Sequence, residues 1–371
     1  MRLIKGMLTG VWASCASGQT VAHSTKAVGV LDILDHIPEG VLGRPARALH
    51  EVLNGPTLIH LPGRRPDPLF VSVLLHGNED TGWEALRGLL ETNAGRALPR
   101  ALIIFIGNIE AARHGVRRLD HQRDYNRVWP GGEAPDSPEA KLMLQVCELM
   151  RRQSLFASID VHNNTGFNPH YTGVNRLDHR YLHLATLFSR VVVYFTRPTG
   201  VCSQVMGEQC PAVTLESGQP GLVSGEEHVR EYLRACLHLS QLPIHPVATH
   251  DLDLYHTVAT VKVPEGVSIG FGAEDCDLCF PAALDHMNFR ELPVGSLIAN
   301  HSRPGGQPLD VVDERGDRVS EKYLERDDDA IRLKRAVMPA MLTCDVRVIR
   351  QDCLCYFMER YPIGESVPGA G

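Results

Sequence analysis

Three polar motifs in this chain each stand where an apolar run of strand length ends. The motifs are His76-Gly77-Asn78-Glu79, Asp160-Val161-His162 and Glu216. A mononuclear catalytic zinc usually takes three nitrogen or oxygen ligands from the protein and leaves one position for water. A His-x-x-Glu motif with a distant histidine offers such a set, and a separate carboxylate beyond it can act as a base. The sequence therefore predicts one Zn2+ per chain, with three ligands: His76, Glu79 and His162.

The joint placement of these residues matters more than any one of them. A single histidine after a strand is far more often a turn residue than a metal ligand, and a lone His-x-x-Glu match is weak. In an open parallel sheet, ligands bind beyond the carboxyl ends of the strands, because the loops gather there. One edge of such a sheet could therefore assemble four side chains: His76, Glu79, His162 and Glu216.

Apolar runs of strand length alternate with amphipathic helical patterns through the middle of the chain. Strands are predicted at 57–60, 68–75, 102–106, 155–161, 191–195 and 212–215. Helices are predicted at 81–92, 137–152, 181–189 and 226–239. Thr81 and Ser137 are the expected N-caps of the first two helices. This alternation is typical of an α/β fold, and we expect a mostly parallel mixed sheet with helices on both faces.

The texture of the sequence changes near residue 246. Short β-type segments separated by Gly, Pro and Asp turns follow, at 257–263, 268–271, 296–300, 308–312 and 344–350. We therefore predict three regions along the chain. They are an N-terminal extension at 1–50, a zinc hydrolase catalytic domain at 51–245 and a small β-rich C-terminal domain at 246–371.

An arginine cluster follows the predicted strand at 102–106. Its members are Arg113, Arg117, Arg118, Arg123 and Arg127. A run of charge is most often a solvated surface. Here, however, the cluster falls in a loop region at the same sheet edge as His76, and a guanidinium matches a carboxylate through two parallel hydrogen bonds. An anionic substrate group or an oxyanion is therefore a second interpretation of the cluster.

The composition is that of an ordinary globular protein. Of 371 residues, 43% are hydrophobic and 22% are charged, and the net charge of -7 offers no general affinity for nucleic acid or anionic lipid. No apolar run approaches the ~20 residues of a membrane span, and the broken apolar stretch in 1–24 is not expected to be a signal peptide. Among ten irregularly spaced cysteines, Cys276-x-x-Cys279 is the only close pair of metal-like spacing, so we expect reduced thiols in a soluble, cytoplasmic protein.

Four motifs together resemble those of the zinc carboxypeptidase superfamily. In chain order they are His76-Gly77-Asn78-Glu79, Asp124-Tyr125-Asn126-Arg127, Asp160-Val161-His162 and Thr214-Leu215-Glu216-Ser217-Gly218. The closer resemblance is to the succinylglutamate desuccinylase/aspartoacylase branch, and it covers about residues 55–240. It implies the fold of that branch, a β-rich C-terminal region and zinc-dependent hydrolysis of an amide bond.

The resemblance also implies roles for single residues. His76, Glu79 and His162 would be the zinc ligands. Glu216 would be the general base that takes a proton from zinc-bound water and hands it to the leaving nitrogen.

Four further residues take roles from the same resemblance. Asn126 and Arg127 would hold the carboxylate of the substrate. Arg118 would polarise the scissile carbonyl, and Asp124 would orient His76 as its hydrogen-bond acceptor.

The chain departs from the pattern of this branch at two places. Arg118 lies one residue further from the Asn-Arg pair than expected, so Arg117 and Arg123 are alternatives for its role. Aspartoacylases also use an arginine shortly before the catalytic glutamate to bind the carboxylate of the acyl group. This chain has no arginine at 199–209, and Arg197 is the nearest, which argues against an aspartyl or succinyl acyl group.

We therefore expect a zinc-dependent amidohydrolase that cleaves a small anionic N-acyl amino acid. A metallocarboxypeptidase acting on short peptides would share every catalytic residue and is the first alternative. An inactive zinc-binding relative is the second, although Glu216 and the paired arginines argue against it. No nucleic acid or membrane partner is expected, and the sequence leaves open whether the chain forms a homo-oligomer.

Overall fold

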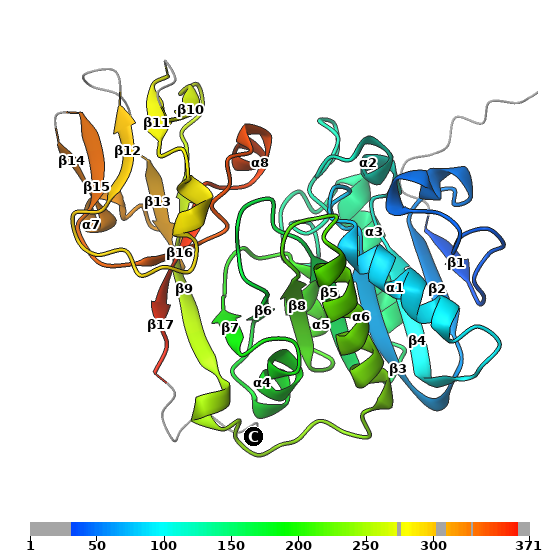
Figure 1. The fold of residues 1–371 in the computed structure, drawn as a ribbon. Coiled ribbons are helices and arrows are strands. Elements are labelled where there is room, and N and C mark those ends of the chain that lie inside the picture. The colour runs from blue at the N-terminus through cyan, green and yellow to red at the C-terminus, as the bar shows by residue number, and fades with distance from the viewer. Residues whose placement is uncertain (1–30, 273–275, 302–308, 328, 363–371) are drawn as a thin grey trace, which may run out of the picture.

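A large mixed sheet forms the centre of the molecule (Figure 1). The computed structural model describes residues 31–272, 276–301, 309–327 and 329–362; residues 1–24, where no signal peptide is expected, lie outside this description. The strands of the central sheet are β1 Asp32–Leu34, β2 Thr57–Leu61, β3 Gly63–Val73, β4 Leu98–Ile106, β5 Ala157–His162, β6 Tyr171–Val174, β7 Val191–Tyr194, β8 Ala212–Glu216, β9 Asp253–Lys262, β13 Asp310–Asp313, β16 Met338–Ala340 and β17 Cys355–Arg360.

The order of the strands places parallel pairs in the middle of the sheet. The order is β1-β2-β4-β3-β5-β8-β6-β7-β9-β17-β16, and β13 pairs with β9 off this path. β3 pairs in parallel with β4 and β5, and β5 pairs in parallel with β8. β2–β4, β6–β8 and the pairs formed by β13, β16 and β17 are antiparallel. The predicted α/β fold with a mixed sheet is confirmed.

Helices cover both faces of this sheet. On one face lie α1 Thr81–Thr92, α4 His179–Thr186 and α6 Val223–His238, and on the other lie α3 Pro138–Met150 and α5 Cys202–Met206. Neighbouring strand residues alternate between the two layers. In β4, for example, Ile104 belongs to the core under α1 and α6, whereas Phe105 belongs to the core under α3. This period of two is the geometry of an extended strand.

The starts of two helices test the predicted N-caps. The Ser137 hydroxyl accepts a hydrogen bond from the backbone N–H of Ala140 at 3.1 Å, which confirms it as the cap of α3. The prediction for Thr81 is wrong, because Asp80 occupies the N-cap position of α1. The backbone N–H of Thr81 instead donates to Oδ1 of Asn163 at 3.2 Å. This bond ties the start of α1 to the residue that follows β5.

The C-terminal region contributes to two sheets. Five of its strands form a separate sheet in the order β10-β11-β12-β15-β14, with bounds β10 Ile269–Phe271, β11 Leu278–Phe280, β12 Leu297–His301, β14 Leu324–Asp327 and β15 Ala330–Leu333. Figure 1 shows this smaller sheet beyond one end of the central sheet, where β9 and β17 run between them. Because β9, β13, β16 and β17 belong to the central sheet, that sheet continues across residue 246, and the predicted domain division stays a prediction.

Short helices complete the described part of the chain, and two expectations fail there. The short helices are α2 Ile109–His114, α7 Ser320–Tyr323, α8 Val346–Gln351 and 3-10 turns at Ala46–Glu51, Thr249–Asp251 and Leu284–Met287. The segment 344–350, expected as a strand, forms α8, because the Asp345 carboxylate caps the N–H groups of Arg347 and Val348. Cys276 and Cys279 form a disulfide, so the expectation of reduced thiols is wrong for this pair.

None of the helices in the described ranges is both long and apolar enough to cross a lipid bilayer.

Candidate active site

The first motif is placed by a sharp turn after β3. Leu74, directly after the strand, has a φ of 56°, a left-handed conformation that a leucine seldom adopts. Gly77 then passes α2 so closely that a Cβ would lie 2.2 Å from backbone atoms of Ala111 and Ala112. Only glycine fits at this approach. The turn leaves His76 at the edge of the sheet, with Glu79 just before α1.

The other two motifs end neighbouring parallel strands. His162 is the last residue of β5 and Glu216 is the last residue of β8, and the two are paired in register. The carboxyl ends of β3, β5 and β8 therefore meet, as expected for a ligand site at the edge of an open sheet.

Three side chains converge at this edge. Nδ1 of His76 lies 2.8 Å from Oε1 of Glu79, and Nδ1 of His162 lies 2.7 Å from Oε2 of the same carboxylate. One ligand atom from each residue lies within 4.8 Å of the others. All three residues are buried, at 3% exposure for each histidine and 5% for Glu79. The structure thus brings together the three predicted metal ligands.

An aspartate lies on the far side of each histidine ring. Nε2 of His76 lies 3.0 Å from Oδ1 of Asp124, and Nε2 of His162 lies 2.8 Å from Oδ2 of Asp160. If the Nδ1 atoms bind a cation, each Nε2 would carry the proton and donate it to the carboxylate behind the ring. Carboxylates behind metal-bound histidines commonly orient the ring in this way.

This arrangement fits a cation between the rings and Glu79. Both Nδ1 atoms and the Glu79 carboxylate point toward one another, as the ligands of a shared cation do. Burial alone would raise the pKa of Glu79, but the two histidines hold it below its usual value. Burial alone would lower the pKa of His162, but Asp160 and Glu79 raise it well above its usual value. Two imidazole nitrogens and one carboxylate are also a ligand set that suits Zn2+.

Glu216 stands beside this group and is 9% exposed. Burial raises the pKa of Glu216 to about 8; His162 opposes the shift, whereas Glu79 and Asp160 add to it. Oε2 of Glu216 accepts a hydrogen bond from Nδ2 of Asn164 at 2.8 Å. A carboxyl group that titrates near neutral pH can both accept and return a proton.

The arginine cluster divides between the site and the surface. We call His76, Glu79 and His162 the metal group. Arg117 is buried and lines a cavity beside this group, and its Nε donates to Oδ2 of Asp124 at 2.9 Å. Arg118 does not line this cavity, because its guanidinium donates to the backbone carbonyl of Gln122 at 3.0 Å. Arg113 and Arg123 are exposed. The structure therefore places the alternative Arg117, and not Arg118, at the site.

Asn126 and Arg127 both line the cavity, but other groups already engage them. Nδ2 of Asn126 donates to Oδ2 of Asp160 at 3.3 Å, and Oδ1 accepts from the backbone N–H of Cys202 at 2.9 Å. Nη2 of Arg127 donates to Oδ1 of Asp352 at 2.7 Å. Asp124 lies behind His76, where the resemblance implied it would be.

Sequence reasoning missed the residues that the C-terminal region supplies. Asp352, between α8 and β17, bridges two guanidinium groups, with Oδ2 3.3 Å from Nη2 of Arg117 and Oδ1 bound to Arg127. Tyr356 of β17 lies with its hydroxyl 3.4 Å from Nη2 of Arg127. Asp352 stands 225 residues after Arg127, and no motif surrounds it. No local signal in the sequence could have found it.

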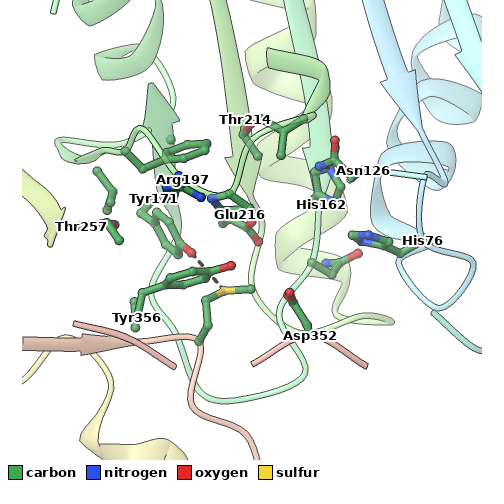
Figure 2. A pocket seen from close by; sticks show the side chains of 18 of the residues that line it. His76, Asn126, His162, Tyr171, Arg197, Thr214, Glu216, Thr257, Asp352 and Tyr356 are labelled. Carbon is green, nitrogen blue, oxygen red and sulfur yellow. Dashed lines mark hydrogen bonds between the residues drawn. The ribbon is translucent and has the colours of Figure 1, made fainter. Parts of the chain in front are cut away.

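A cavity of about 90 Å³ connects these groups (Figure 2). Figure 2 shows His76, His162 and Glu216 on one side of it, with Asp352 and Tyr356 across from them. Away from the metal group the lining becomes largely apolar. It includes Tyr171 and Gly173 of β6, Val193 of β7 and Met358 of β17, and Arg197 also contributes.

Comparison with known proteins gives the same family as the motifs. Residues 68–240 match the family described as Succinylglutamate desuccinylase/Aspartoacylase catalytic domain. A succinylglutamate desuccinylase from Burkholderia lata is 40% identical over 82 residues, which cover 21% of this chain and 23% of that protein. The aligned part thus spans about a quarter of that curated relative.

Solved structures share the fold over a larger part of the chain. The succinylglutamate desuccinylase from Chromobacterium violaceum superposes with a TM-score of 0.53 at 20% identity, covering 80% of this chain and 85% of that one. Murine aminoacylase 3 superposes with a TM-score of 0.51 at 17% identity, covering 81% of this chain and 97% of that one. These likenesses extend beyond the matched range into the C-terminal region and concern the fold alone.

The predicted resemblance is therefore confirmed. The metal group, Glu216 and the arginine cluster all lie inside the matched range. Residues 68–240 thus resemble the catalytic domain of the succinylglutamate desuccinylase/aspartoacylase branch, and the fold is that of its solved structures.

Proposed function

We propose that this chain is a zinc-dependent hydrolase that cleaves the amide bond of an N-acyl amino acid. The observation that carries the proposal is a convergence of groups. Ligand atoms of His76, Glu79 and His162 lie within 4.8 Å of one another, and Glu216 lines the same cavity. The family matched by residues 68–240 supports the reaction type, because desuccinylases and aspartoacylases are named for removing acyl groups.

Each residue of the group has a distinct task in this proposal. A zinc ion held by His76, Glu79 and His162 would lower the pKa of water and polarise the scissile carbonyl. Glu216 takes the proton of the attacking water and passes it to the leaving nitrogen. Its raised pKa of about 8 suits both halves of this transfer.

The arginines that line the cavity are proposed to bind the substrate. Arg117 takes the carbonyl-polarising role that the resemblance gave to Arg118, because Arg117 lies in the cavity with Nη1 3.9 Å from Oε1 of Glu79. Arg127, with Asn126 beside it in the lining, remains the proposed contact for the carboxylate of the amino acid. Both arginines stay protonated when buried, so they can pair with an anionic group.

A substrate panel with matched variants tests this function. We expect about one zinc per chain in the wild type and in Glu216→Gln, whereas kcat on N-acyl amino acids falls by about 10³-fold in the variant. Glu208→Gln, an exposed change outside the cavity, is the control and should keep full activity. Activity confined to dipeptides would favour a carboxypeptidase. Zinc binding without hydrolysis of either substrate class would favour an inactive relative.

A further inference from the structure

Asn164 contacts Glu216 from the loop that follows β5. Its side-chain Nδ2 donates to Oε2 of Glu216 at 2.8 Å, and the residue is 2% exposed. Its backbone N–H donates to the carbonyl of Gly218 at 2.9 Å, so the residue holds the end of β8 at two points. Nδ2 is therefore the half of the amide that faces Glu216.

The other half of the Asn164 amide makes no hydrogen bond. Oδ1 is buried and has no partner among the described residues. It lines a small cavity of about 20 Å³ together with Asn78, Cys353 and Asp352, and Oδ1 of Asn78 is likewise without a partner. A buried carbonyl without a partner costs free energy, so a side chain that served packing alone would be apolar here. The Nδ2 donor, and not the carbonyl, is therefore the part of the Asn164 side chain that makes a contact of use to the site.

The bond from Asn164 restrains one side of the Glu216 carboxylate. Within the described ranges it is the one hydrogen bond recorded for this carboxylate. It occupies Oε2, whereas Oε1 makes no hydrogen bond to the described residues. A catalytic carboxylate must be held within a fraction of an ångström of its working position, and a neighbouring hydrogen bond commonly provides this.

We infer that Asn164 is a positioning residue, whose Nδ2 holds the Glu216 carboxylate so that Oε1 faces the attacking water. The inference rests on the proposed function, because it assigns a task to the base of that reaction. It goes beyond the metal ligands and the base, because it assigns a task to Asn164, the second residue of the loop that follows β5.

Two substitutions at this position test the inference. Asn164→Leu has nearly the same size but no donor, and we expect kcat to fall by about 10- to 100-fold with KM changed by less than about twofold. Asn164→Asp places an acceptor in the same shape, and a larger fall in kcat is expected because two carboxylates then repel each other. The zinc content should stay at about one per chain in both variants.

Stability separates a positioning role from a structural one. Asn164→Leu removes a buried carbonyl that has no partner but also leaves Oε2 of Glu216 without its donor, so the two effects oppose each other and the variant should stay folded at the assay temperature. In a Glu216→Gln background, Asn164→Leu should lower kcat no further, because both changes act through the same carboxylate. Asn93→Leu, which removes an amide bonded to the carbonyl of Leu89 at the end of α1, is the control and should leave kcat unchanged.

The possible results divide cleanly. An unchanged kcat in Asn164→Leu, a fall of equal size in the Glu216→Gln background, or a fall accompanied by lost zinc or by unfolding at the assay temperature would overturn the inference. If Glu216→Gln itself keeps full activity, the proposed base is wrong, and the failure belongs to the proposed function.

Discussion

Two regions of the molecule contribute to one cavity in different ways. We call them the metal edge, at the ends of β3, β5 and β8, and the C-terminal wall, formed by α8 and β17. The metal edge supplies residues at strand ends, where the sheet itself brings them together. The C-terminal wall supplies Asp352 and Tyr356, which reach the cavity through contacts with Arg117 and Arg127. Residues at strand ends inherit their positions from backbone pairing, whereas residues of the wall depend on packing between distant parts of the chain.

The metal edge should therefore tolerate no loss of a ligand, and this gives the largest expected effect. His76→Ala removes one of three ligands from a buried site and leaves Glu79 and Asp124 without their shared partner. We expect zinc to be lost after dialysis and hydrolysis to fall below detection, because a catalytic zinc site needs all of its protein ligands. Metal analysis and the substrate assay measure both.

The control for this change is an exposed histidine. His36→Ala, whose ring pairs with Asp35 at the surface, should leave zinc content and activity unchanged. If His76→Ala keeps its zinc, the ligand assignment is wrong, and the metal edge is not the metal site.

The same contrast explains which features the sequence predicted. The apolar run at 212–215 followed by Glu216 predicted β8 and its end to within one residue, because a buried parallel strand is nearly all apolar. The helix α1 was predicted with its observed bounds, since Trp83, Leu86 and Leu90 recur on one face. Strand ends thus place His162 and Glu216, whereas the turn after β3 places His76 and Glu79.

Features that depend on distant packing were not predicted. The strand β6 has only four residues, and it pairs in parallel with β7 and antiparallel with β8. Its sequence is too short to show a strand-like length or periodicity. In the loop after α2, spacing alone could not decide which arginine turns inward. Asp124 and Asp352 determine that choice by binding Arg117, and one of them lies far downstream in the chain.

Arg117, in the loop after α2, contacts both the metal edge and the C-terminal wall. Substitutions of Arg117 and of its neighbour Arg118 should therefore affect activity differently. Arg117→Met should lower kcat/KM by about 100-fold, because it removes a buried cation beside the reacting carbonyl. Arg117→Lys should recover only part of this, since an ammonium lacks the planar fork. Arg118→Met should stay within about twofold of the wild type. Steady-state kinetics on one N-acyl amino acid compare the three variants, and a larger effect at Arg118 would restore the original assignment.

The C-terminal wall should affect stability more than chemistry. Asp352→Asn removes the carboxylate shared by two buried guanidinium groups, and breaking such a pair costs about 3–5 kcal/mol. Asp120→Asn is the matched control, because Asp120 pairs with Arg347 at the surface and is 93% exposed; its loss should cost less than about 1 kcal/mol. Urea unfolding measures the free energy of each variant. Equal costs for the two would mean that Asp352 does not hold the arginines in solution.

The smallest expected effect concerns the pH dependence of stability at the metal edge itself. The folded protein raises the pKa of Glu216 to about 8 from a usual value of 4.5, so between these pH values the folded state holds a proton that the unfolded state has released. Stability therefore falls as pH rises through this window, and Glu216→Gln removes that contribution. In protein stripped of metal by a chelator, the melting temperature of the variant should gain a few degrees over the wild type between pH 5 and pH 8. A constant difference across this range would show that Glu216 is ionised in the folded protein. Burial would then raise the pKa of Glu216 far less than its buried position at the metal edge implies.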